Sequence, residues 1–201
     1  MSSNVLVLTG PPGAGKSTIA GELARRQPKA VHLHTDDFWD CIVSGVIPPY
    51  EPASDAQNQT VMEAIAKAAW TYAAGGFMTV VDGIVGPWML GHFRTQAIER
   101  PDVLIDYVVL RPRRDIALAR AQARTAVSAL VDEAPILAMW DQFSDLGALE
   151  HHALDTSDED AAKQRSTRRG CPCGRPVQAC ILMCPCGTVT SILIRHQPSG
   201  A

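Results

Sequence analysis

The feature that most constrains this chain is a glycine-rich loop between an apolar run and a helical pattern. Residues 10–17 read Gly-Pro-Pro-Gly-Ala-Gly-Lys-Ser and fit the pattern G-x-x-x-x-G-K-[ST]. Residues 4–9 before the loop read as a buried parallel strand, and the apolar residues in 17–26 after it recur at helical spacing. This strand–loop–helix order predicts a phosphate-binding loop rather than a chance match.

In such a loop, successive backbone N–H groups point inward at the phosphates of a nucleotide, beside the N-terminus of the following helix. The lysine is expected to reach the β- and γ-phosphates, and the serine hydroxyl is expected to ligate Mg²⁺. The residues predicted to bind the nucleotide are therefore Gly10, Gly13, Ala14, Gly15, Lys16, Ser17 and Thr18.

Carboxylates follow two further predicted strands. Asp36 and Asp37 come directly after a short strand at 30–34, and Asp82 lies near the end of a strand at 77–83. Open parallel sheets bind their ligands at the carboxyl ends of their strands. Asp82 is therefore predicted to hold Mg²⁺ directly or through water, and the aspartate pair marks a second functional position. The alternatives are that Asp36 or Asp37 caps the next helix and that Asp82 is a turn residue.

The rest of the chain alternates strand and helix patterns. Five strands are expected in a mostly parallel sheet with helices on both faces, which is a three-layer α/β fold of the P-loop NTPase type. A capping pattern at Ser157 and Asp160 predicts a last helix after the fifth strand. The further elements expected are helices at 40–45, 57–74, 88–98, 113–125 and 136–143, and strands at 103–110 and 151–156.

Three arginines in the helix predicted at 113–125 share one face. Arg113, Arg120 and Arg124 are separated by seven and four residues, which is a helical spacing. Near a phosphate site, such a face would clamp phosphate groups or the phosphoryl group in transfer. The alternative is an ordinary solvated basic face.

Charge divides the chain unequally. All 21 acidic residues lie at or before Asp160, whereas six of the 18 basic residues lie in 163–201. An acidic body argues against nucleic acid as a partner, because phosphate backbones are bound by basic faces. The sequence has no run of about 18 apolar residues and no basic leader, so we expect no membrane partner and a cytoplasmic location. It does not indicate an oligomeric state.

A composition break near residue 163 predicts two regions, a domain at 1–162 and a Cys/Arg-rich tail at 163–201. Five of the six cysteines lie in the tail, where they form two C-x-C pairs with Cys180 between them. These thiols could hold zinc, although structural zinc sites usually use C-x₂₋₄-C spacing. They could also make a redox-labile tail, or the tail could be a poorly ordered extension without a function of its own.

Taken together, the motifs resemble the P-loop small-molecule kinases, the group of gluconate kinase, shikimate kinase and chloramphenicol phosphotransferase that is often labelled as AAA-family ATPases. The resemblance covers about residues 1–160. It rests on Gly10–Ser17, Thr35-Asp36-Asp37, the loop 44–51, Val81-Asp82-Gly83, and Arg111-Pro112 with the arginine helix.

The resemblance implies transfer of the γ-phosphoryl group of ATP to a hydroxyl group of a small molecule, with Mg²⁺. It implies that Asp36, or else Asp37, contacts the acceptor hydroxyl as the base. It also implies that Arg120 and Arg124 are lid arginines that stabilise the transition state. The alternatives are an antibiotic-modifying phosphotransferase and a nucleotide-binding ATPase or regulator without an acceptor.

The sequence disfavours two classes of acceptor molecule. The sequence lacks the glycine triplet that shikimate kinases carry after the third strand, and residues 40–76 hold no arginine, which nucleotide kinases usually have there. Shikimate and nucleotides are therefore disfavoured. Five aromatic residues could line an acceptor pocket or belong to the core: Phe38, Trp39, Tyr50, Trp88 and Phe93.

Overall fold

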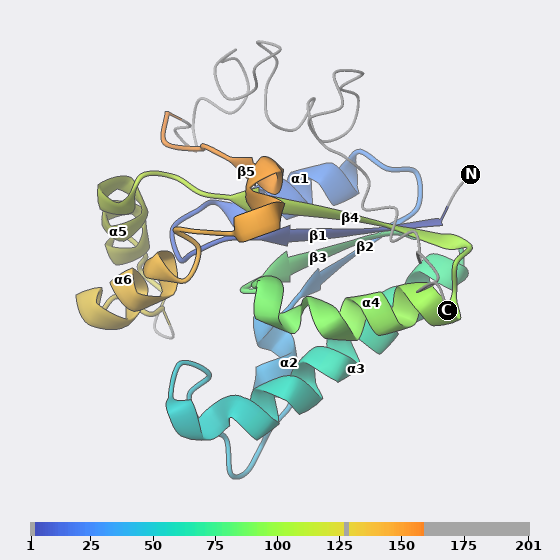
Figure 1. The fold of residues 1–201 in the computed structure, drawn as a ribbon, viewed down its shortest axis with the longest axis horizontal. Coiled ribbons are helices and arrows are strands. Elements are labelled where there is room, and N and C mark those ends of the chain that lie inside the picture. Colours follow the sequence, from blue (N-terminus) through green and yellow to red (C-terminus); the bar gives the residue numbers. More distant parts are fainter. Residues whose placement is uncertain (1–2, 127–128, 159–201) are drawn as a thin grey trace, which may run out of the picture.

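The computed structural model describes residues 3–126 and 129–158, which are built around a five-stranded parallel sheet (Figure 1). The strand order is β2-β3-β1-β4-β5, and every neighbouring pair is parallel. The predicted α/β fold is confirmed, with a sheet that is purely rather than mostly parallel. The strands are β1 (Ser3–Thr9), β2 (Ala30–His34), β3 (Met78–Gly83), β4 (Val103–Leu110) and β5 (Ala153–Leu154).

Helices lie on both faces of the sheet. In Figure 1, α1 lies on one side of the sheet, and α3 and α4 lie on the other. No helix in the described ranges is long and apolar enough to span a membrane. The helices are α1 (Lys16–Arg25), α2 (Asp36–Asp40), α3 (Asp55–Ala74), α4 (Leu90–Glu99), α5 (Arg114–Gln122) and α6 (Glu133–Asp141), with short 3₁₀ turns at Pro52–Ser54, Pro87–Met89 and Gly147–His152.

Alternate residues of the central strand build two separate cores. Leu6 and Leu8 of β1 pack with the buried face of α1, whereas Val5 and Val7 pack with α3 and α4. All four side chains are at most 1% exposed. A strand buried on both faces must be apolar at consecutive positions, which is why residues 5–8 lack the alternation of a half-exposed strand.

The segment after β2 differs from the prediction. The expected helix at 40–45 is absent, and α2 instead occupies Asp36–Asp40 with both carboxylates in its first turn. Carboxylates are favourable there because the N-terminus of a helix carries a partial positive charge. Beyond the helix, the chain turns at Gly45 with a φ of +76°, and the Gln57 side chain bonds both the N–H and the carbonyl of Ile47.

Several boundaries also differ. Helix α6 begins at Glu133 rather than Ile136, because a proline such as Pro135 is tolerated in the first turn of a helix. The fifth strand is shorter than 151–156, since a 3₁₀ turn occupies Gly147–His152. The predicted last helix and the whole tail at 163–201 lie outside the described residues, so the proposed domain boundary stays a prediction.

Candidate active site

The glycine-rich loop connects β1 to α1 as predicted. Gly10, Gly13 and Gly15 all have φ between +78° and +144°, and Gly15 is the N-cap of α1. Ala14 is buried, and its N–H is bonded to the carbonyl of Pro11 at 3.2 Å, while Thr18 is exposed in the first turn of the helix. The loop and the helix N-terminus thus form the arrangement that binds phosphate groups in other proteins.

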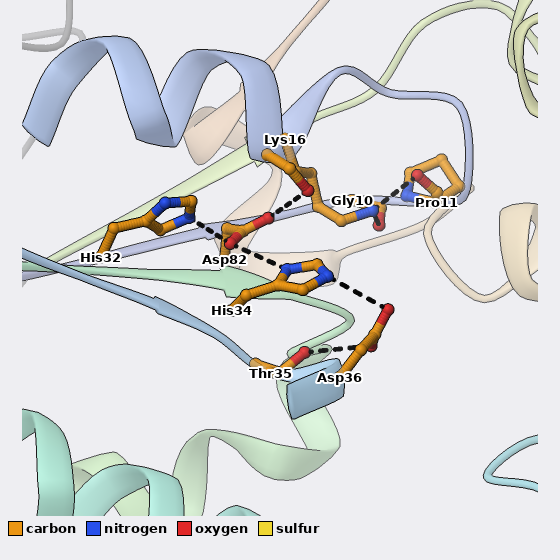
Figure 2. A network of polar contacts seen from close by, with 9 residues as sticks. Gly10, Pro11, Lys16, His32, His34, Thr35, Asp36 and Asp82 are labelled. Atoms are coloured by element: carbon orange, nitrogen blue, oxygen red, sulfur yellow. Dashed lines mark hydrogen bonds and ion pairs between the residues drawn. The ribbon is translucent and has the colours of Figure 1, made fainter. Parts of the chain in front are cut away.

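Lys16 crosses this loop. Its Nζ atom donates hydrogen bonds to the carbonyl oxygens of Gly10 at 2.9 Å and Pro11 at 3.0 Å (Figure 2). Burial and, to a smaller extent, the nearby Arg124 cation lower the pKa of Lys16 to about 8, against the opposing effects of Asp82 and Asp36. Within the described residues, the hydrogen bonds of this ammonium group go to two neutral carbonyl groups, so it is suited to receive an anion such as a phosphate.

Asp82 is fully buried near the end of β3 and faces the start of α1. Its Oδ2 atom accepts a hydrogen bond of 2.6 Å from Ser17 Oγ, and its Oδ1 atom lies 2.5 Å from His32 Nε2 and 3.1 Å from His34 Nδ1. Burial alone would raise the pKa of Asp82. The hydrogen bonds from His32, His34 and Ser17 outweigh that effect and hold this pKa well below its usual range.

The donor set fits Mg²⁺. Ser17 and Asp82 present adjacent oxygen atoms, the ligand type that this hard cation prefers. Among the described residues, no group of three or more His, Cys, Asp or Glu side chains is arranged to hold a metal without other ligands. This agrees with Mg²⁺ chemistry, since the ion usually keeps several waters and binds through one or two protein groups plus the phosphates of the substrate.

Asp36 lies across from the loop, at the first position of α2. Its Oδ2 atom is 3.5 Å from His34 Nε2, and its Oδ1 atom accepts a hydrogen bond of 3.5 Å from Thr35 Oγ1 (Figure 2). The hydrogen bond from His34 lowers the pKa of Asp36, burial opposes this, and the charges of His34 and Lys16 lower it again. Asp36 is therefore an ionised carboxylate whose pKa is lowered in part by the charge of Lys16. Both Asp36 and Asp37 are exposed, but of the two carboxyl groups only that of Asp36 lies within 4 Å of a histidine in the described ranges.

A close approach of two chain segments sets this geometry. The Thr35 N–H donates to the carbonyl of Asp82 at 2.9 Å, which continues the β2–β3 pairing one residue past the strand. A Cβ atom on Gly83 would lie 1.8 Å from Thr35 Oγ1. Only glycine at position 83 therefore permits the close contact between Gly83 and Thr35, which places the neighbouring Asp36 near Asp82.

The segment after β3 is fixed by two buried hydrogen bonds. Val85 N–H donates to Thr9 Oγ1 at 2.8 Å, and Tyr107 Oη donates to the carbonyl of Val85 at 2.8 Å. Both hydroxyl groups come from neighbouring strands and are completely buried. Burial also holds the pKa of Tyr107 well above its usual range, so its hydroxyl group stays a neutral donor and keeps the Val85 segment in place.

The prediction that three arginines share one face of a helix at 113–125 is wrong, because α5 (Arg114–Gln122) has Arg113 as its N-cap and ends before Arg124. Arg120 donates to the carbonyls of Thr156 at 2.9 Å and Ser157 at 3.1 Å, so it binds the segment after β5. Arg113 is paired with Asp115 at 3.7 Å. Arg124 is close enough to Lys16 to lower its pKa. Of the three, Arg124 is the one whose charge acts on Lys16 of the glycine-rich loop.

The aromatic candidates for an acceptor pocket also divide. Phe93 is fully buried and packs on Trp70, so it belongs to the core. Trp39 donates to the Asn58 side chain at 3.0 Å. Tyr50 and Trp88 are about half exposed, and the Trp88 ring also contacts the buried Phe143. A separate cavity of about 310 Å³ involves one predicted arginine, Arg113, and none of the residues predicted to bind the nucleotide, Mg²⁺ or the acceptor hydroxyl; it is lined by Arg111, Pro112, Arg113, Trp140, Ala153 and Asp155.

Sequence reasoning missed the two histidines. His32 and His34 are two residues apart on β2, so their side chains share one face of the strand. The register pairs His34 with Asp82 across the β2–β3 ladder. The available signal was the His-x-His alternation just before the aspartate pair. It could be interpreted only if β2 and β3 were known to be neighbours.

Comparisons with known proteins agree with this arrangement. A family model described as AAA domain matches residues 5–146. No curated protein matches the sequence of the chain. Among solved structures, a gluconokinase from Sinorhizobium meliloti 1021 shares 16% identity at a TM-score of 0.58, with 81% of this chain and 87% of that chain covered.

Two other structures show the same fold. The tunicamycin resistance protein of Deinococcus radiodurans has a TM-score of 0.56 at 13% identity and covers 80% of this chain and 90% of its own. A chain of the Pnkp1/Rnl/Hen1 RNA repair complex has a TM-score of 0.55 at 18% identity, covering 69% of this chain. This chain spans only 43% of that larger relative. At such identities the likeness establishes the fold.

Proposed function

The chain belongs to the AAA domain family and has the fold of the P-loop small-molecule kinases, and from this premise we propose that it is an ATP- and Mg²⁺-dependent kinase for a hydroxyl group of a small molecule. The observation that carries the proposal is the placement of an ionised carboxylate, Asp36, within the field of Lys16 and across from the phosphate-binding loop. A carboxylate at that position can take the proton of an acceptor hydroxyl group, whereas an ATPase would use it to orient water. We also propose that it acts in the cytoplasm, without nucleic acid or membrane partners.

In the proposed reaction, the loop N–H groups and Lys16 bind the phosphates of ATP. Ser17 and Asp82 would hold Mg²⁺, which neutralises charge on the β- and γ-phosphates. The acceptor oxygen attacks the γ-phosphorus, the bond from that phosphorus to the β–γ bridging oxygen breaks, and Asp36 takes the hydroxyl proton. Arg124 and Arg120 are proposed to offset negative charge that develops in the transition state. The bonds that Arg120 makes to the segment after β5 would then have to be exchanged.

The surroundings of Asp36 favour an uncharged acceptor. Residues 40–76 contain one basic residue, Lys67, which is exposed and paired with Glu63 on α3. Exposed apolar side chains occur in the loop after α2, at Val43, Val46 and Tyr50. A hydroxylated molecule with an apolar part suits these surfaces better than a phosphorylated or strongly acidic one.

The test is ADP release from ATP and Mg²⁺ across a library of hydroxylated metabolites and antibiotics. The wild-type chain is compared with Asp36→Asn and with Asp37→Asn, a matched change on the same helical turn. We expect acceptor-dependent release that Asp36→Asn removes with ATP binding retained, and that Asp37→Asn leaves largely intact. Lys16→Ala should weaken ATP binding itself. Slow, acceptor-independent release in all the proteins would instead favour an ATPase or regulator.

An antibiotic acceptor is the second candidate. It is favoured by the structural likeness to a protein named for tunicamycin resistance, which covers 80% of this chain. The reaction would be the same, and only the acceptor would differ. Expression of the chain in a sensitive host should then raise the inhibitory concentration of one antibiotic in a panel, and Asp36→Asn should cancel that protection.

A further inference from the structure

We propose that His34 is a positioning residue that holds the Asp36 carboxylate toward the phosphate site, by bridging it to the buried Asp82. The contact itself is independent of the reaction. Its kinetic consequence rests on the proposed function. Neither histidine belongs to the motifs that define the phosphate-binding loop or the metal-binding strand.

The two ring nitrogens of His34 face two different carboxylates. Nδ1 lies 3.1 Å from Asp82 Oδ1, and Nε2 lies 3.5 Å from Asp36 Oδ2 (Figure 2). Asp82 is immobile, because it is fully buried and also bonded to Ser17 and His32. The imidazole therefore connects a fixed anchor to the carboxylate at the start of α2.

Asp36 needs such a connection. Its side chain is 76% exposed, and its other contact is the 3.5 Å hydrogen bond from Thr35 Oγ1. An exposed aspartate side chain rotates freely unless it is hydrogen-bonded, and a misplacement of about 1 Å in a reacting group can reduce a rate about a hundredfold. Without His34, the carboxylate would spend less time in the orientation that an acceptor hydroxyl requires.

His32 supplies an internal control. It lies on the same face of β2 and contacts the same Asp82 oxygen, at 2.5 Å. Its ring centroid is 6.5 Å from that of His34, further along the strand from α2. Replacing either histidine removes a hydrogen bond to Asp82, but only replacement of His34 removes the partner of Asp36. Any effect that both replacements share comes from Asp82.

The first test observes Asp36 directly. In the full chain labelled with ¹³C at the aspartate carboxyl carbons, the Asp36 signal is assigned from Asp36→Asn and compared at pH 7 in wild type, His34→Gln and His32→Gln. We expect His34→Gln to shift the Asp36 signal. His32→Gln should change the Asp36 signal no more than it changes the signals of the other aspartates. An Asp36 signal that is unchanged by His34→Gln, or moved equally by both variants, overturns the proposal.

The second test is a double-mutant cycle on the acceptor-dependent reaction. We expect His34→Gln to lower kcat by between about tenfold and a hundredfold, with less change in the KM for ATP. In an Asp36→Asn background the same substitution should add little further loss, because the residue it positions is already disabled. The loss from His32→Gln should instead multiply with that of Asp36→Asn.

The outcomes separate the two proposals. If His34→Gln and Asp36→Asn reduce kcat independently, His34 does not act through Asp36, while the kinase reaction stands. If the wild-type chain transfers phosphate to no acceptor, the proposed function fails, and the carboxyl signal alone decides whether His34 holds Asp36.

Discussion

Replacement of Gly13 by alanine tests how the phosphate-binding loop is held against α5. Gly13 has a φ of +78°, and a Cβ atom there would lie 2.1 Å from the carbonyl oxygen of Ala117 in α5. Gly15, two residues later, has a φ of +89° and nothing within 4 Å of its Cβ position. Both substitutions therefore impose the left-handed backbone penalty, and only the first adds a collision with the backbone.

The magnitudes follow from these two costs. A left-handed conformation costs a non-glycine residue about 1–2 kcal/mol, and forcing extra volume into a packed site costs about 1–3 kcal/mol more. We expect Gly15→Ala to lower the free energy of unfolding by about 1–2 kcal/mol and Gly13→Ala by about 2–5 kcal/mol. In thermal unfolding, each kcal/mol corresponds to a drop in Tm of about 2–4 °C for a chain of this size.

The assay is urea unfolding at pH 7, with the slope m checked for constancy across the variants. Gly45→Ala provides a control outside the loop, since Gly45 has a φ of +76° and open space around its Cβ position. It should resemble Gly15→Ala. Equal losses in Gly13→Ala, Gly15→Ala and Gly45→Ala would refute the reasoning, because α5 would then yield to the added methyl group at no cost.

Three further predictions concern the site. Burial lowers the pKa of Lys16 to about 8, and bound phosphates would raise it, so ATP binding near pH 9 should take up a proton. Calorimetry in buffers of different ionisation enthalpy measures this proton uptake. The Lys16→Ala substitution should abolish it. Gly83→Ala should push Thr35 away, destabilise the chain by about 1–3 kcal/mol, and reduce kcat more than ATP affinity, as steady-state kinetics would show. The hydrogen bonds from Asp36 and Asp82 raise the pKa of His34 to about 10, above its unfolded value, so its contribution to stability is complete below about pH 6.5 and is lost as the pH rises through about 10. The stability difference between wild type and His34→Gln in urea should therefore be larger at pH 6 than at pH 10.5, and a difference that grew with pH would contradict this assignment.

The features that could be predicted from the sequence are those that depend on residues close together in the chain. The loop at 10–17 was found because its glycines, its lysine and the flanking patterns must all occur together in one stretch. The strands at 30–34 and 103–110 match the structure residue for residue, since both are short runs bounded by residues that end them. The end of α3 at Ala74 followed in the same way from two consecutive glycines.

The sequence was insufficient where the outcome depends on neighbours distant along the chain. The helix expected at 40–45 begins earlier in the structure: Thr35 rather than an aspartate is its N-cap, and Asp36 and Asp37 already lie in its first turn. The roles of His32 and His34 depend on the pairing of β2 with β3, and 43 residues separate the end of one strand from the start of the other. No local pattern states which strands become neighbours.

The three arginines show that a helical spacing in the sequence does not determine which partners the side chains contact. A spacing of seven and four residues would place three side chains on one face of a helix, but α5 spans only Arg114–Gln122, so Arg113 is its N-cap and Arg124 lies beyond its C-cap. Arg113 contacts Asp115, Arg120 binds the carbonyls after β5, and the charge of Arg124 acts on Lys16. Each guanidinium group binds the nearest acceptors or charges, and these come from segments that the helix meets only in the folded chain. The helical spacing therefore did not predict a shared surface: in the folded chain Arg120 binds the carbonyls of Thr156 and Ser157, whereas Arg124 lies close enough to Lys16 to lower its pKa.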